Sequence, residues 1–85
     1  MVRIRTVVWT DKFERELRKV KDKTPKMRVR KKIEEMLEDP EIGKPLRFET
    51  RGERSIRISP FRLIYAVEGD TIYLLRFEHR KLAYR

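Results

Sequence analysis

The spacing of apolar residues changes near residue 40, and this change limits the possible folds more than any other feature. Between residues 11 and 38, apolar residues recur at the three- and four-residue spacing of amphipathic helices. From residue 55 onward they alternate or run continuously, as strands do, over 55–58, 61–68 and 71–78. A β-branched run at 2–9 precedes the helices and also predicts a strand. Helices followed by grouped strands predict an α+β domain.

The two predicted helices have recognisable starts. Thr10 or Asp11 offers an N-cap for a helix over 11–22. Thr24 followed by a proline is typical of a second helix whose first helical position is the proline, and this helix should end before Asp39. Because the join between them is short, we expect an antiparallel helix hairpin.

The remaining segments complete the predicted order β-α-α-β-β-β-β. Prolines and a glycine make 40–45 a loop, and a short strand is expected at 46–50. A glycine and an aspartate at 69–70 predict a hairpin turn, and 79–85 is a charged tail. We therefore expect residues 1–85 to form one domain, with the helix hairpin packed on one face of an antiparallel sheet and the other face left for a ligand or partner.

The charge of the chain suggests a polyanionic partner: nucleic acid, an anionic membrane or an acidic protein. The net charge is +9. Residues 1–43 carry seven Lys and six Arg, whereas residues 44–85 carry two Lys and eight Arg. Since arginine presents a planar fork that grips phosphate through two hydrogen bonds, this bias predicts that the second half is the recognition surface. The alternative is that arginine merely covers exposed strands of a heat-stable protein, which the charge-rich composition also fits.

Several functional classes are excluded because the residues that they require are absent from the sequence. Without cysteine there is no disulfide framework and no thiolate metal site, and one histidine excludes a paired-imidazole ribonuclease within a monomer. The clustered acidic residues are interpreted as a solvated face of the second helix and its exit, where Arg30 can pair with Glu34 and Lys31 with Glu35. The cluster comprises Glu34, Glu35, Glu38, Asp39 and Glu41. No nucleotide-binding loop, signal-peptide core or membrane-spanning run is present, so we expect a cytoplasmic protein without metal or cofactor and without a membrane partner.

What remains is metal-free chemistry on a phosphodiester that uses Arg, Lys, Tyr and one His, and this chemistry is physically feasible for RNA. The substrate's own 2′-OH can serve as the nucleophile, so the protein has to align it, stabilise the negative phosphorane and move two protons. Arginines suit the stabilisation, and a tyrosine or lysine can act as the base if cationic neighbours lower its pKa. Ser-His-Asp catalysis lacks a nucleophile-elbow motif.

The second half resembles the RelE/ParE toxin superfamily. The resemblance lies in the run Ile56-Arg57-Ile58-Ser59-Pro60-Phe61-Arg62-Leu63-Ile64-Tyr65, then Glu68-Gly69-Asp70, and finally His79-Arg80 with Tyr84. In the first half, Phe13 and the passage from Asp39-Pro40 to Gly43-Lys44-Pro45-Leu46 fit the same pattern. The resemblance implies a RelE-like fold, a cognate acidic RelB-like antitoxin and, on the RelE side, a ribosome-dependent mRNA endonuclease acting on mRNA in the ribosomal A site.

The resemblance also implies roles for individual residues. Arg62 is expected to hold the scissile phosphate and stabilise the phosphorane. Arg80 is expected to stabilise charge or protonate the leaving 5′-oxygen, and Tyr84 to orient or deprotonate the 2′-OH or to stack on a base. The remaining basic residues expected to hold RNA are Lys44, Arg47, Arg51, Arg54, Arg57, Arg76 and Lys81.

Two departures from the family pattern leave alternatives open. Ser59-Pro60 replaces the usual Gly-Asp turn before the aromatic residue, and a lysine-rich catalytic strand is absent. Arg62 could instead bridge to Glu68 or Glu49, and His79 could cap or pack rather than catalyse. The competing functions are a ParE-like inhibitor of DNA gyrase without nuclease activity, and a catalytically inactive relative that only binds nucleic acid.

Overall fold

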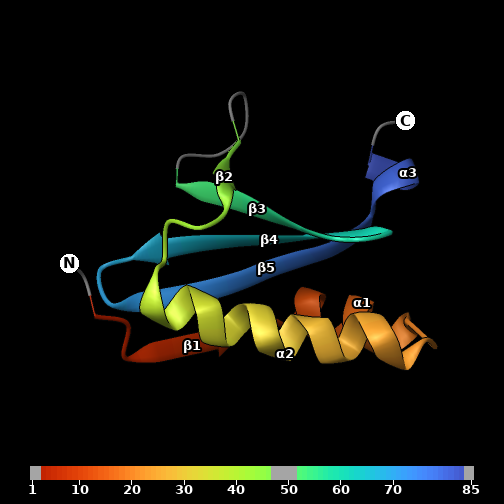
Figure 1. The fold of residues 1–85 in the computed structure, drawn as a ribbon, viewed down its shortest axis with the longest axis horizontal. Coiled ribbons are helices and arrows are strands. Elements are labelled where there is room, and N and C mark those ends of the chain that lie inside the picture. Colours follow the sequence, from red (N-terminus) through yellow and green to blue (C-terminus); the bar gives the residue numbers. More distant parts are fainter. Residues whose placement is uncertain (1–2, 47–51, 84–85) are drawn as a thin grey trace.

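The computed structural model describes residues 3–46 and 52–83, and two helices lie against one side of a five-stranded sheet (Figure 1). The elements in chain order are β1 (Thr6–Trp9), α1 (Asp11–Lys19), α2 (Lys23–Glu38), β2 (Lys44–Pro45), β3 (Glu53–Ile58), β4 (Phe61–Glu68), β5 (Thr71–His79) and the short α3 (Arg80–Ala83). The predicted α+β architecture, with the helix hairpin on one face of the sheet, is confirmed.

The sheet has the strand order β1-β5-β4-β3-β2. Strands β2 to β5 pair with their neighbours in antiparallel fashion, as predicted for the sheet, while β1 lies parallel to β5, with Thr6 opposite Thr71. The β3–β4 turn, Ser59-Pro60, keeps the close register in which Ile58 faces Phe61. The chain therefore places the beginning of β4 and the end of β5 at the same end of the sheet as α3 (Figure 1).

The start of α1 agrees with the sequence prediction, whereas the start of α2 differs from it. Thr10 is the N-cap of α1: its Oγ1 accepts from the amide of Phe13 at 3.3 Å and donates to the carbonyl of Leu74 at 2.6 Å. α2 begins earlier than predicted, because Asp22 is its N-cap and accepts from the amide of Thr24. The proline at 25 thus occupies the third helical position rather than the first, where its missing N–H still costs no helical hydrogen bond.

Other boundaries also shift. α1 ends at Lys19 instead of reaching residue 22. The two-residue strand Lys44–Pro45 lies in the segment predicted as a loop, and residues 47–50 of the strand expected at 46–50 lie outside the described part. Part of the tail at 79–85 forms the short helix α3.

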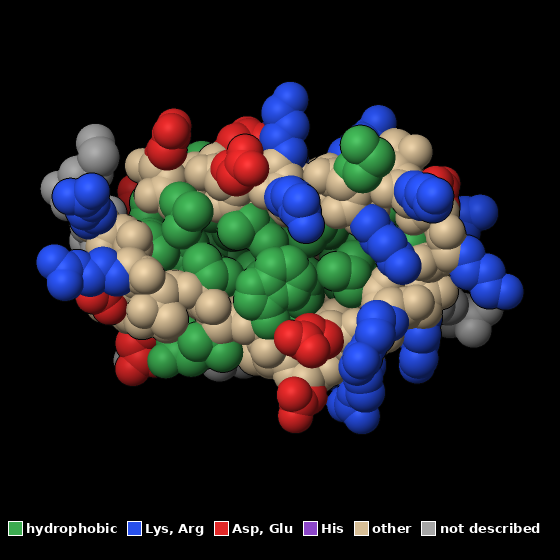
Figure 2. Space-filling model, turned by 90° about the horizontal axis from the view of Figure 1, so that it is seen from below, with side chains coloured by type: hydrophobic (Ala, Val, Ile, Leu, Met, Phe, Trp, Pro, Cys, Tyr) green, Lys and Arg blue, Asp and Glu red, His purple; other side chains and the backbone are tan. Residues whose placement is uncertain are grey.

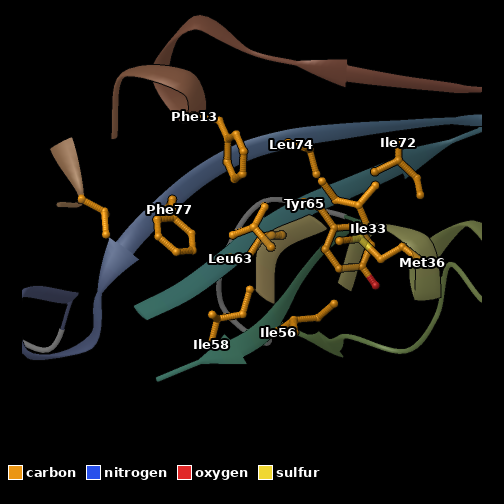
Figure 3. Close-up of a cluster of buried hydrophobic side chains, with 12 residues drawn as sticks. Phe13, Ile33, Met36, Ile56, Ile58, Leu63, Tyr65, Ile72, Leu74 and Phe77 are labelled. Atoms are coloured by element: carbon orange, nitrogen blue, oxygen red, sulfur yellow. The ribbon is translucent and has the colours of Figure 1, made fainter. Parts of the chain in front are cut away.

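The hydrophobic core fills the space between the helices and the sheet (Figure 3). Phe13 of α1 and Met36 of α2 are fully buried against Leu63, Tyr65 and Leu74 of the central strands. The ring of Phe13 meets those of Trp9 and Phe77 edge to face, with centroids 5.5 and 6.0 Å apart. Burial of these side chains fixes which face of the sheet the helices cover.

A β-bulge in β5 sets which residues reach the opposite face. Ile64 pairs with Arg76, but the next residue, Tyr65, pairs with Leu74, so Leu75 is an extra residue in β5. As a result Phe77 returns to the core face after Leu74, while Arg76 lies on the face away from the helices. Strict alternation through β5 would have given the reverse placement.

Among the described residues, no helix is both long and apolar enough to span a lipid bilayer.

Candidate nucleic-acid interface

The face of the sheet away from the helices, here called the open face, carries a row of charged residues across three strands. Arg57 of β3 lies directly opposite Arg62 of β4, which in turn lies opposite Glu78 of β5. Two like charges at adjacent positions repel each other, so the row needs a counter-charge. Glu78 provides it, with its Oε2 atom 3.1 Å from a terminal nitrogen of Arg62.

Arg57 and Arg62 line a concave region that we call the arginine pocket. Its volume is about 560 Å³. Its lining residues are Lys32, Glu35, Ile42, Lys44, Ser55, Ile56, Arg57, Arg62 and Arg80. The pocket is lined from β3 by Ser55, Ile56 and Arg57, and Ser55 is paired with Lys44 of β2.

The arginine pocket has the charge expected of an anion site. Five lining side chains are cationic and one, Glu35, is acidic. A hollow lined by one sign of charge concentrates the field and attracts the opposite ion. Two or more guanidinium groups can share the oxygens of one phosphate through paired hydrogen bonds.

A chain of ion pairs holds the open face beside the pocket. Glu78 binds Arg62 through Oε2 and the Nε of Arg76 through Oε1, at 2.9 Å. A terminal nitrogen of Arg76 also lies 3.0 Å from Oε1 of Glu53, the one charged side chain among the described residues that is buried. Although partial burial lowers the pKa of Arg76, the bonds and charges of Glu53 and Glu78 raise it on balance. Arg76 therefore remains charged between two carboxylates.

The loop that carries Lys44 to the pocket is anchored by a buried tyrosine. The hydroxyl of Tyr65 donates to the carbonyl of Pro40 at 2.7 Å and accepts from the amide of Gly43 at 2.9 Å. A Cβ atom on Gly43 would come within 2.8 Å of that hydroxyl oxygen, so the approach requires glycine. Burial raises the pKa of Tyr65 above its ordinary value, although the Gly43 amide and the charge of Arg54 act in the opposite direction.

The structure brings together four of the residues predicted to act on RNA. Arg57, Arg62, Arg80 and Lys44 all line the arginine pocket. Tyr84, Arg47 and Arg51 lie outside the described residues.

Three other predicted RNA-binding residues are placed elsewhere. Arg54 donates to the carbonyls of Gly43, at 2.8 Å, and Glu41, at 3.2 Å, and so holds the loop into β2. Arg76 is engaged by its two carboxylates, and Lys81 lies on α3 near the β3–β4 turn.

His79 has structural contacts, in line with the capping and packing alternative. Its Nδ1 accepts from the amide of Lys81 at 3.2 Å, which shapes the start of α3. Its ring meets that of Phe61 edge to face, with centroids 5.3 Å apart. Among the described residues Arg62 bridges to Glu78 rather than to Glu68, and Glu49, the other predicted partner, lies outside the described residues.

Sequence reasoning missed two residues of the site. Lys32 lines the arginine pocket from α2, although its helical position gave no sign that this face meets the β3 edge. Glu78 binds two arginines at once, and only the bulge at Leu75 places it on their face.

The acidic residues of α2 pair differently from the prediction. The ion pair found in this helix is Lys32–Glu35, at 3.6 Å, in place of the pairs predicted for Arg30 and Lys31. No group of three or more potential metal-ligating residues occurs within residues 3–46 and 52–83.

Comparisons with known proteins agree with this architecture. Residues 7–84 match the family described as ParE toxin of the type II toxin–antitoxin system parDE. Toxin RelG of Mycobacterium tuberculosis is 41% identical over 46 residues, a match that covers 52% of this chain and only about half, 53%, of RelG.

Solved structures extend the likeness over most of the chain. A chain of the toxin–antitoxin complex RelBE2 from M. tuberculosis has a TM-score of 0.74 and 32% identity, covering 88% of this chain and 96% of that one. A chain of the RelB–RelE antitoxin–toxin complex from Methanococcus jannaschii has the same fold, with a TM-score of 0.74 and 24% identity, covering 91% of this chain and 94% of that one. This chain belongs to the RelE/ParE superfamily of toxins of type II toxin–antitoxin systems.

Proposed function

We propose that the protein is a toxin that cuts mRNA on the ribosome, with the 2′-OH of the RNA as nucleophile and without a metal ion. The observation that carries the proposal is the convergence of Arg57, Arg62, Arg80 and Lys44 on one pocket. Such a cluster is suited to a phosphate whose negative charge grows in the transition state. Membership in the RelE/ParE superfamily supports the same assignment.

In the proposed reaction a bond forms between the 2′-oxygen and phosphorus, and the bond from phosphorus to the 5′-oxygen breaks. One proton leaves the 2′-OH and another joins the 5′-oxygen, so the products carry a 2′,3′-cyclic phosphate and a 5′-OH. Arg62 would bind the phosphate oxygens and Arg80 would stabilise the leaving oxygen. Tyr84 would orient the 2′-OH or accept its proton. Arg57 and Lys44 would hold adjoining phosphates.

Translation reactions test this proposal directly. We expect the protein to cut an mRNA that is being translated and to leave 2′,3′-cyclic phosphate ends. The matched control is the same mRNA with a single 2′-deoxy nucleotide at the cleaved position, which should stay intact there because it lacks the nucleophile. Intact mRNA on translating ribosomes, or cleavage of the deoxy control, would contradict the proposed chemistry.

The second candidate is inhibition of DNA gyrase without nuclease activity. The match of residues 7–84 to a family of ParE toxins favours it. A supercoiling assay with purified gyrase separates the two candidates. Loss of supercoiling with mRNA left intact would select the gyrase inhibitor, whereas cleavage with normal supercoiling would select the ribonuclease.

We also propose an acidic antitoxin as the partner of this chain. The net charge of +9 calls for an acidic chain. The helix side offers apolar surface, including Trp9 and Leu37, each 41% exposed. Figure 2 shows apolar side chains gathered in the middle of this side, with charged side chains around them. An acidic protein encoded beside this one, forming a stable complex on co-expression and relieving toxicity, would support the pairing; a neighbour that neither binds nor protects would contradict it.

A further inference from the structure

A second concave region continues the arginine pocket around the edge of β3. It has a volume of about 460 Å³ and is lined by Arg28, Lys31, Lys32, Glu35, Arg57 and Ile58. Lys32, Glu35 and Arg57 line both regions. The two are therefore neighbours that share walls, and a ligand chain leaving the first can enter the second.

Three of the four basic residues that line the second region lie on one stripe of α2, and the fourth, Arg57, lies on β3. Arg28, Lys31 and Lys32 have the three- and four-residue spacing of neighbours on a helix surface. Figure 1 shows α2 running along the length of the sheet, so this stripe extends away from the arginine pocket. The helix thus offers positive charge in a line rather than at a point.

The acidic residue in this region neutralises little of the charge. Glu35 pairs with Lys32 at 3.6 Å, and its side chain is 44% exposed. An exposed pair of this kind is weak and is screened by salt. Arg28 and Lys31 are exposed, and within residues 3–46 and 52–83 no aromatic ring lines either region. The chemistry that these residues present is therefore that of a phosphate binder rather than a base-stacking platform.

We propose that the β3 edge and α2 form a phosphate track for single-stranded RNA. The strand would leave the arginine pocket, cross the β3 edge at Arg57 and Lys32, and place its next phosphates against Arg28 and Lys31. This inference rests on the proposed function, because it extends the same RNA beyond the scissile phosphate. Recognition along the track is of the backbone and is independent of base sequence.

The same helix provides a matched control. Lys26 and Arg30 are exposed on α2, as Arg28 and Lys31 are, but they line neither concave region. At 100° per residue they lie on the opposite side of the helix from Arg28. The variants Arg28→Gln/Lys31→Gln and Lys26→Gln/Arg30→Gln remove the same charge and the same residue types from one helix.

The experiment measures binding of 2′-O-methyl RNA, which cannot be cleaved, as a function of salt. Two lengths are used: about three nucleotides, enough for the arginine pocket, and about ten, enough to reach α2. For the longer RNA, Arg28→Gln/Lys31→Gln should weaken binding roughly ten- to thirty-fold at about 0.1 M salt and lower the salt slope by about 1.4. The control variant should bind like the wild type, and the trinucleotide should not distinguish the variants.

The outcomes separate this inference from the proposed function. If the trinucleotide binds but both double variants weaken the longer RNA equally, α2 contributes only general charge and the track is overturned. If the trinucleotide binds no better to the wild type than to Arg62→Ala, the arginine pocket does not hold phosphate, and the proposed function fails together with the track. Deoxy strands of both lengths, bound with the same pattern, would support recognition of the phosphate backbone.

Discussion

The two ends of the open face use arginine in different ways. At one end, Arg57 and Arg62 line the arginine pocket together with Lys44 and Arg80. At the other, Arg76 lies between Glu53 and Glu78 and is engaged by both. Among the described residues, two carboxylates engage Arg76, and for this reason we assign the proposed anion site to the arginine pocket and not to Arg76. Glu78 joins the two ends because it binds both Arg62 and Arg76.

The largest effect should come from the pocket end. Arg62→Ala removes a guanidinium from the proposed phosphate site and should lower the rate of mRNA cleavage about 10²- to 10³-fold. Arg18→Ala, which removes an exposed arginine of α1, is the control and should leave the rate unchanged. Cleavage by Arg62→Ala at the wild-type rate would show that the pocket is not the reaction site.

At the other end, a change at Arg76 should affect the stability of the fold rather than the cleavage rate. Arg76→Ala leaves the buried carboxylate of Glu53, 7% exposed, without this partner and should lower the free energy of unfolding by about 3 kcal/mol or more. Urea denaturation measures the change. The double variant Glu53→Ala/Arg76→Ala should recover part of the loss, because it no longer buries an uncompensated charge. A single variant as stable as the wild type would contradict the role assigned to this end.

An intermediate loss of stability is expected from a change at Tyr65, which anchors the loop into β2. Tyr65→Phe leaves the Gly43 amide and the Pro40 carbonyl without their bonds and should cost about 1–3 kcal/mol. Because burial raises the pKa of Tyr65, its neutral hydroxyl stabilises the fold fully below the ordinary tyrosine pKa of about 10. That contribution is lost as pH rises through the raised folded-state pKa.

Thermal unfolding across this pH range checks the assignment. The wild type should lose stability more steeply than Tyr65→Phe above pH about 10. Parallel profiles for the two proteins would indicate that the hydroxyl does not titrate with unfolding.

The smallest effect should come from the residue that joins the two ends. Glu78→Gln keeps a hydrogen-bonding side chain but removes the charge that fixes Arg62. We expect the cleavage rate to fall about tenfold because the guanidinium is less well oriented. RNA affinity should rise, because one negative charge next to the pocket is gone. A fall in affinity together with the rate would argue against a positioning role.

Much of the fold could be predicted because local patterns and global architecture agree. The apolar spacing of α1 and α2 and the alternation in β3 correspond to buried faces, and the turn at Gly69 falls where the hairpin needs one. Boundaries were less accurate: Asp22 and Thr24 are both good N-caps, and the residue that the chain uses depends on how α1 ends against the sheet.

The candidate site was predicted in part for a similar reason. Arg57 and Arg62 lie at comparable distances from the turn between β3 and β4, so their pairing follows from a hairpin. Lys32 could not be assigned in this way, because it meets the pocket only through the packing of α2 near the β3 edge. Such a contact joins residues far apart in sequence and leaves no local signal.

The sequence by itself determined the α+β architecture, the excess of positive charge and the arginine-bearing hairpin, because these depend on apolar period, composition and short-range turns. Only the tertiary structure decided the partners of the arginines. The extra residue Leu75 in β5 returns Phe77 to the core and places Arg76 and Glu78 on the open face. A bulge reverses the alternation after it, and the packing of both sheet faces fixes its position, so the pattern of β5 alone could not reveal it.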